Sequence, residues 1–155
     1  MKNLHRLDAK SLEERAMVIR RHIIRMLTRA GSGHPGSSLS TVDLLVALFY
    51  NKLRHNPQLP AWPDRDRFIL SKGHGCPALY AILAEMGYFN ADNLDTLRKF
   101  GSILHGHPCM KTTPGVEISG GSLGQGLSVG LGIALAAKLD KKDYRTYVML
   151  GDGEI

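Results

Sequence analysis

The sequence has no long hydrophobic run and only two cysteines. Its longest apolar run, residues 44–50, is seven residues long, whereas roughly 20 are needed to span a bilayer. This excludes a membrane-spanning helix, and the polar first 14 residues predict no signal peptide. Cys76 and Cys109 fit no metal or redox spacing and indicate free thiols in a reducing compartment. We therefore expect a cytoplasmic protein with no membrane partner.

The excess of basic over acidic residues lies almost entirely in the N-terminal segment. The formal net charge is +6, and residues 1–30 hold eight Lys and Arg against three acidic residues. No aromatic side chains alternate with these arginines, as a stacking platform for single-stranded nucleic acid would require. We interpret the excess as the solvated face of one helix and expect no nucleic-acid partner, a phosphate-binding stripe being the less favoured alternative.

Internal repeats and low-complexity tracts are absent, whereas glycine is abundant, at 17 of 155 residues. Nine of these glycines lie between Gly115 and Gly153. Because 43% of the residues are hydrophobic, the chain can bury one core. Residues 1–155 are therefore expected to form one domain or part of one.

The apolar spacing predicts helices separated by two short buried strands. A capping box with Ser11 as the N-cap and Glu14 three residues later predicts a helix that ends before Gly31. After a glycine-rich loop at 31–36, helices are expected over 43–52, 77–86, 91–100 and 123–139, and strands over 67–71 and 146–150. Asn90 is the expected N-cap of the 91–100 helix. The 123–139 helix has a face of small residues: Gly126, Gly130, Ala134 and Ala137. This pattern predicts an α/β fold with a parallel sheet and helices on both faces.

Four of the seven histidines lie beside glycine, at positions 34, 74, 105 and 107. Glycine lets the backbone approach a ligand closely, and loops after strands are where α/β proteins build sites. One such histidine is more simply a loop hydrogen-bonding group, but separate Gly-His loops in one small chain favour a shared polar site. Zinc is disfavoured because no acidic partner is adjacent and ligand spacing is poor.

Two glycine-rich segments are compatible with phosphate chemistry. Asp152 follows a predicted strand between two glycines, which suits Mg²⁺ bridged to a diphosphate, although Asp-Gly is equally typical of a plain turn. Residues 120–126 precede a predicted helix, whose free N–H groups can bind anions. Their glycine spacing is one residue too long for a dinucleotide fingerprint, and close helix packing explains it as well.

Taken in order, five segments resemble the N-terminal region of the transketolase family: Ser32–Gly36, Asp66–Gly75, Gly106–Pro108, Gly121–Gly126 and Gly151–Gly153. The resemblance runs from about Leu12 to the end of the chain. Residues 115–126 and Lys72 are most similar to the split bacterial type, in which the N-terminal half is a separate subunit. Ser122 and Lys72 depart from the proline and asparagine of many full-length transketolases. The deoxyxylulose phosphate synthase, with an unlike first histidine loop, is less similar.

The resemblance implies an incomplete thiamine diphosphate-binding fold and transfer of a two-carbon ketol unit from a ketose phosphate to an aldose phosphate. It implies that Asp152 binds Mg²⁺, for which Ca²⁺ or Mn²⁺ can substitute. The cofactor contacts that it implies are His74, Gly121, Ser122, Leu123 and Gly153. His34 and His107 would be catalytic residues that hold donor hydroxyls and assist proton transfer.

The resemblance also implies that part of the active site lies elsewhere. A second metal ligand and further strands would follow Ile155, and the glutamate that activates the cofactor would come from the other half of the enzyme. We therefore expect a truncated N-terminal subunit or fragment, inactive alone, that needs a C-terminal transketolase subunit in a homo- or hetero-oligomer and acts on phosphosugars. The alternative is a catalytically inactive fragment that serves only for binding or dimerisation.

Overall fold

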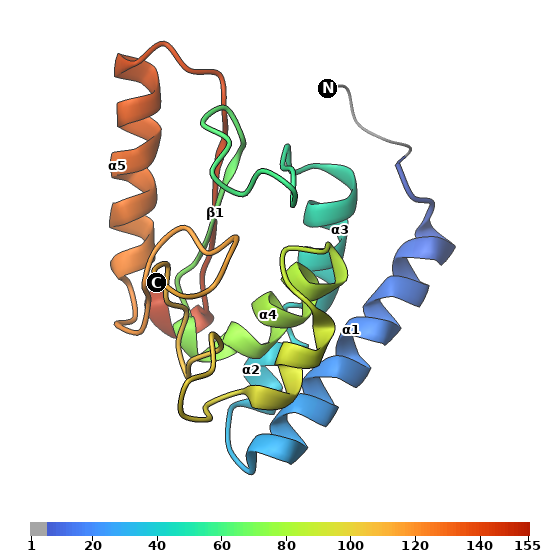
Figure 1. Ribbon diagram of the computed structural model, residues 1–155. Coiled ribbons are helices and arrows are strands. Elements are labelled where there is room, and N and C mark those ends of the chain that lie inside the picture. The colour runs from blue at the N-terminus through green and yellow to red at the C-terminus, as the bar shows by residue number, and fades with distance from the viewer. Residues whose placement is uncertain (1–5) are drawn as a thin grey trace.

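The computed structural model describes residues 6–155 (Figure 1). Two parallel strands pair in register, with Arg67 opposite Thr146 and Leu70 opposite Met149. The elements are, in order, α1 (Ala9–Ala30), α2 (Pro35–Leu39), α3 (Val42–Asn51), β1 (Arg67–Leu70), the 3₁₀ turn η1 (Gly73–Gly75), α4 (Cys76–Glu85), the 3₁₀ helix η2 (Ala91–Thr96), α5 (Gln125–Leu139), β2 (Thr146–Met149) and the 3₁₀ turn η3 (Asp152–Glu154).

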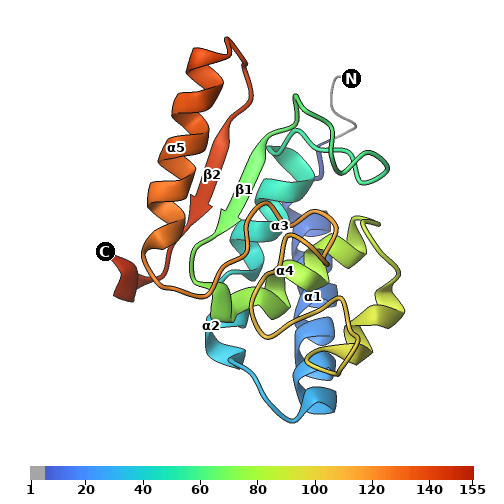
Figure 2. The ribbon, with the colours of Figure 1, turned by 60° about the vertical axis from the view of Figure 1, so that its left-hand side comes forward.

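Helices cover both faces of this small sheet, as the sequence predicts. Figure 2 shows α5 on one side of the strands and α1, α3 and α4 on the other. Phe68 and Leu70 belong to the core that includes α1, α3 and α4. Ile69 and its partner Val148 instead lie near Gly130 of α5. This alternation is the period of a strand that is buried on both faces, so the predicted α/β class with a parallel sheet is confirmed.

Helix α4 is the centre of the core. Every residue from Cys76 to Ala84 is buried, because α4 packs against α1 and α3. Pro77 stands in the first turn of α4, where its missing N–H costs no hydrogen bond. The last turn leads to Gly87, which has φ of 85°. The helix predicted at 77–86 therefore exists, shifted by one residue.

Helix α5 approaches the sheet through its small residues. A Cβ atom added at Gly126 would lie 2.5 Å from the Cβ atom of Ser71, and one at Gly130 would lie 2.4 Å from Cγ2 of Val148. Only glycine permits this separation of helix and strands. The predicted small-residue face is thus the packing face of α5.

Three local predictions are wrong. The N-cap of α1 is Asp8, whose carboxylate accepts a hydrogen bond of 2.8 Å from the Ser11 amide, so the helix begins one turn before the proposed N-cap. The expected loop at 31–36 includes the start of α2, which was missed because five residues give too short a periodic signal. The helix expected after Asn90 does have Asn90 as its N-cap, with a hydrogen bond of 2.9 Å from the Asp92 amide, but it is 3₁₀. It ends at Thr96 rather than at residue 100, and Arg98 then adopts a left-handed φ of 62°.

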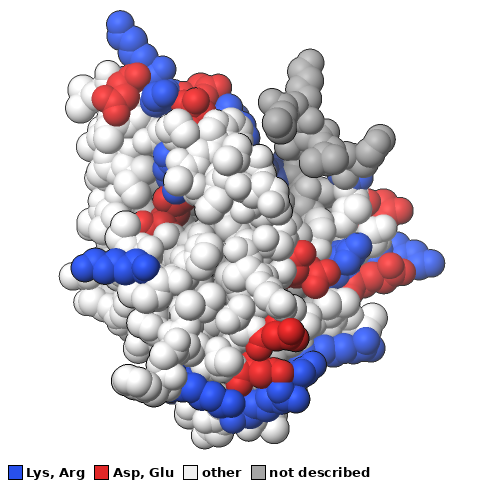
Figure 3. Space-filling view, in the orientation of Figure 1, with Lys and Arg blue, Asp and Glu red and all other residues white. Residues whose placement is uncertain are grey.

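The basic residues of α1 are largely balanced by carboxylates of other elements. Arg15 pairs with Glu85, and Arg20 pairs with Asp43. Arg25 and Arg29 both pair with Asp95. On the face that Figure 3 shows, Lys and Arg lie beside Asp and Glu, and this pairing favours the interpretation as a solvated face. Within residues 6–155, no helix has the length and apolar character that crossing a membrane requires.

Candidate functional site

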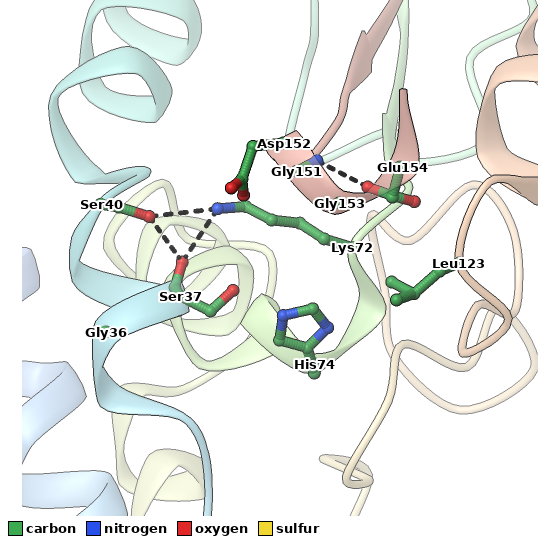
Figure 4. Close-up of a pocket in the computed structure, with 10 residues that line it drawn as sticks. All are labelled: Gly36, Ser37, Ser40, Lys72, His74, Leu123, Gly151, Asp152, Gly153 and Glu154. Carbon is green, nitrogen blue, oxygen red and sulfur yellow. Dashed lines mark hydrogen bonds between the residues drawn. The ribbon is translucent and has the colours of Figure 1, made fainter.

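A pocket of about 440 Å³ lies where the two strands end. In parallel sheets the ligand site forms beyond the carboxyl ends of the strands, and this pocket has that position. Figure 4 shows that its walls come from α2, from the segments after β1 and β2, and from the loop before α5. Its lining residues are Gly36, Ser37, Ser40, Lys72, His74, Leu123, Gly151, Asp152, Gly153 and Glu154.

The strand pairing brings two of the predicted motifs together. The Ser71 amide donates a 2.9 Å hydrogen bond to the Met149 carbonyl, which extends the ladder beyond β1. Lys72 and His74 therefore emerge beside the segment that contains Asp152. The sequence separates these groups by about 80 residues, and the parallel register places them in one pocket.

Lys72 places a cation in the wall of the pocket. Its ammonium donates hydrogen bonds of 3.2 Å to the Ser37 carbonyl and 3.1 Å to the Ser40 hydroxyl. Burial lowers the pKa of Lys72, and the carboxylates of Asp152 and Glu154 oppose that shift. A buried lysine that has hydroxyl and carbonyl partners is suited to neutralise an anionic ligand.

Glu154 connects three segments of the site. Its Oε1 atom accepts from the Ser71 hydroxyl at 2.5 Å and from the Gly124 amide at 2.9 Å, and Oε2 accepts from the Gly151 amide at 2.6 Å. Burial alone would raise the pKa of Glu154, but these hydrogen bonds outweigh it and lower the pKa. The ionised carboxylate thus joins both strand ends to the start of α5, where negative charge is favourable.

The three histidines with predicted roles lie close together. The rings of His34 and His74 are edge to face, with centroids 5.1 Å apart. A Cβ atom added at Gly73 would lie 3.3 Å from Cδ2 of His107, and one at Gly121 would lie 3.6 Å from it. Burial, followed by the nearby His34 and Lys72, lowers the pKa of His74, so its ring is neutral at pH 7. The structure therefore gathers the separate Gly-His loops at one place.

The glycine loop before α5 is divided between two neighbouring cavities. Leu123 lines the main pocket, together with Gly153 and Asp152. Ser122 lines a smaller cavity of about 70 Å³. Gly121 lies against the ring of His107. All eight residues with predicted roles thus line the pocket or lie close to it, and their roles there remain predictions.

Sequence reasoning missed Ser37, Ser40 and Glu154 and took Lys72 only as a subfamily marker. Ser40 and Lys72 interact only because the fold brings α2 against the segment after β1. The one signal in the sequence was that two of these residues lie near the predicted motifs. Ser37 follows His34 by three residues, and Glu154 follows the Gly-Asp-Gly motif. Proximity alone does not say which side chain points into a pocket.

The donor set fits a diphosphate with a divalent cation. The Ser37 hydroxyl is buried and has no hydrogen-bond partner in the described part of the chain, and Ser37 is one of the residues that line the pocket. Such an orphaned group is stabilised if a ligand oxygen meets it. Asp152 presents an exposed carboxylate, and no cluster of three or more metal-ligating side chains occurs within residues 6–155. A metal here would take its remaining ligands from phosphate and water, as Mg²⁺ commonly does.

Comparison with known proteins identifies the family of the chain. The family model described as "Transketolase, thiamine diphosphate binding domain" matches residues 12–155. The chain is 45% identical over 148 residues to a subunit of the apulose-4-phosphate transketolase of Phocaeicola vulgatus, covering 96% of this chain and 52% of that protein. It is 42% identical over 159 residues to human transketolase, covering 100% of this chain and 25% of that protein.

Solved structures of transketolases resemble this chain in fold as well as in sequence. A transketolase from Pichia stipitis superimposes with a TM-score of 0.89 at 38% identity, over 94% of this chain and 23% of that one. The transketolase of Campylobacter jejuni gives a TM-score of 0.89 at 36% identity, over 96% of this chain and 24% of that one. The chain spans about half the length of the Phocaeicola vulgatus protein and about a quarter of human transketolase. It belongs to the transketolase family, and it matches that family's thiamine diphosphate-binding domain.

Proposed function

We propose that this chain provides the diphosphate side of a transketolase-type active site. The reaction would move a two-carbon ketol unit from a ketose phosphate to an aldose phosphate. The observation that carries the proposal is the pocket itself, in which an orphaned hydroxyl, a buried ammonium and an exposed carboxylate meet at the carboxyl ends of two parallel strands. Bound thiamine diphosphate would supply a carbon nucleophile and an electron sink.

The chain's own residues hold the cofactor in this proposal. Lys72, Ser37 and His74 face the diphosphate and offer it one cation and two hydrogen-bond donors. Asp152 binds Mg²⁺, with Ca²⁺ or Mn²⁺ as substitutes. The remaining contacts are backbone and apolar surfaces, namely Gly121, Ser122, Leu123 and Gly153.

His34 and His107 lie beside the pocket and hold the substrate. An imidazole has two ring nitrogens that can form hydrogen bonds, so each ring can bind a sugar hydroxyl and assist a proton transfer. Their grouping with His74 supports this assignment. The alternative of a non-catalytic binding module has less support, because such a module has no need for three histidines gathered beside the pocket.

A C-terminal transketolase subunit completes the site in this proposal. The relatives from Phocaeicola vulgatus and Actinobacillus succinogenes are named as subunits of a transketolase, and this chain covers about half of each. The outer side of α5 supports an oligomer, because Leu127, Leu131, Leu135 and Leu139 are all exposed there. Phosphosugar substrates and a cytoplasmic location complete the proposal, the latter consistent with the free thiols of Cys76 and Cys109.

Asp152→Ala tests the metal site. We expect the chain, combined with a C-terminal transketolase subunit, to transfer a ketol unit between phosphosugars only with thiamine diphosphate and Mg²⁺. The variant should lose the Mg²⁺-dependent part of thiamine diphosphate binding in calorimetry, because its carboxylate is the only protein ligand proposed on this chain. Asp140→Ala, which removes another exposed carboxylate, at the end of α5, is the matched control. Unchanged Mg²⁺ dependence in Asp152→Ala would contradict the assignment.

A further inference from the structure

Two side chains of the buried helix α4 bind the backbone beneath His107. The Tyr80 hydroxyl lies 2.9 Å from the His105 carbonyl oxygen and 3.0 Å from that of His107. The Cys76 thiol lies 3.2 Å from the carbonyl oxygen between them, that of Gly106. Three consecutive carbonyls are thus bound by two donors from one helix.

Both donors keep their protons at neutral pH. Tyr80 and Cys76 are 0% and 1% exposed. Burial raises the pKa of the Tyr80 phenol far above its usual value and raises the pKa of Cys76 to about 12. Because Tyr80 has one proton for two carbonyls, its hydrogen bond is shared between the residues on either side of Gly106. The hydroxyl therefore fixes the direction of the turn that carries His107.

The ring of His107 lies against two glycine residues. His107 is exposed, and its imidazole lies over the backbone of Gly73 and Gly121. His74 is in the 3₁₀ turn that leads directly into α4. The same rigid helix therefore sets the position of His74 through the chain and that of His107 through Tyr80 and Cys76.

We propose that Tyr80 is a positioning residue that orients His107 toward the pocket from inside the core. The proposal rests on the function proposed above, in which His107 acts on the substrate. Tyr80 touches neither substrate nor cofactor in this arrangement. Its effect passes through the backbone on which the imidazole is mounted, and a displacement of about 1 Å at a catalytic group can cost about 100-fold in rate.

Tyr80→Phe is the test, because it removes the hydroxyl and keeps the ring in the core. Tyr88→Phe is the matched control, since the Tyr88 hydroxyl also bonds a histidine, at 3.0 Å from Nδ1 of His55, but away from the pocket. In the full chain, we expect the imidazole NMR signals of His107 to shift in Tyr80→Phe and to stay unchanged in Tyr88→Phe. Unchanged His107 signals in folded Tyr80→Phe would overturn the proposal.

Measuring kcat in the presence of the C-terminal subunit is the second test, after the NMR comparison. Tyr80→Phe should lower kcat by about 10- to 100-fold while thiamine diphosphate affinity is retained, because the proposed diphosphate ligands do not depend on the His107 turn. In the background of His107→Ala, the same change should have no further effect on kcat. Additive losses in the double variant would show that Tyr80 does not act through His107.

The two tests separate this proposal from the proposed function. If the wild-type pair shows no ketol transfer, the function fails, and the NMR comparison still decides whether Tyr80 orients His107. If Tyr80→Phe does not fold, NMR of the wild-type chain decides. A Tyr80 hydroxyl that donates to the His105 and His107 carbonyls should give a phenol proton signal that is protected from exchange and has NOE contacts to residues 105–107. A phenol proton without these contacts would then overturn the proposal.

Discussion

The two faces of the sheet are covered in different ways. On one face, α1, α3 and α4 enclose Phe68 and Leu70 in a core whose central helix is wholly buried. On the other face, α5 is the covering helix, and it meets the strands through Gly126 and Gly130. Its larger apolar side chains point elsewhere: Leu127, Leu131, Leu135 and Leu139 are 50–83% exposed.

The difference shows that apolar content alone does not identify the interior helix. Both α4 and α5 are rich in apolar residues, yet leucines of α4 contribute to the core and those of α5 contribute to the surface. What distinguishes them is that α5 has Gly126 and Gly130 on one side whereas α4 has no glycine, and that side of α5 is the side that packs. Substitutions on the two helices should therefore have very different effects on stability.

Leu83→Ala should have the largest effect. Leu83 is 0% exposed in α4, and truncating a buried leucine removes apolar burial and leaves a cavity. We expect the free energy of unfolding to fall by about 2–5 kcal/mol, as measured by denaturant unfolding of the full chain. A loss below about 1 kcal/mol would mean that the core around α4 can collapse into the space.

Gly126→Ala should have the next largest effect, on the other face. The new methyl group would lie 2.7 Å from the Cα atom of Ser71, so backbone rather than a side-chain tip must move. We expect a loss of about 1–3 kcal/mol from overpacking, measured in the same way. Gly132→Ala is the control within α5, because nothing lies within 4 Å of its Cβ position. That variant should be stabilised by about 0.5–1 kcal/mol through helix propensity, and equal losses in both would refute the close approach of α5.

The sequence was sufficient to predict the α/β class and the two strands, because each strand is a short apolar run next to a glycine motif. The observed strands, Arg67–Leu70 and Thr146–Met149, are each one residue shorter than expected. The predicted N-cap of α1 was wrong because two capping patterns overlap there. Ser11 was the predicted N-cap, but Asp8 is the N-cap, and it accepts its hydrogen bond from the Ser11 amide. Local sequence patterns do not show which of two competing side chains makes the bond.

The candidate site was predictable only where its residues lie in motifs. His34, His74, His107 and Asp152 stand out beside glycine, and the fold brings them into or near one pocket. Ser40 could not be predicted, because it belongs to the site only through its contact with Lys72, which lies about 30 residues later in the chain. Tertiary contacts of this kind depend on helix packing, which periodicity does not specify.

Leu131→Ala should have the smallest effect and is the sharpest check of the contrast between the two helices. The substitution is chemically identical to Leu83→Ala, but Leu131 is 61% exposed on the outer side of α5. Because alanine has the higher helix propensity and little apolar contact is lost, we expect a change within about 0.5 kcal/mol. The measurement is denaturant unfolding of the full chain at two protein concentrations. A loss that approaches that of Leu83→Ala and grows with concentration would mean that copies of the chain cover this face in solution. The contrast between the two helices would then describe only the isolated chain.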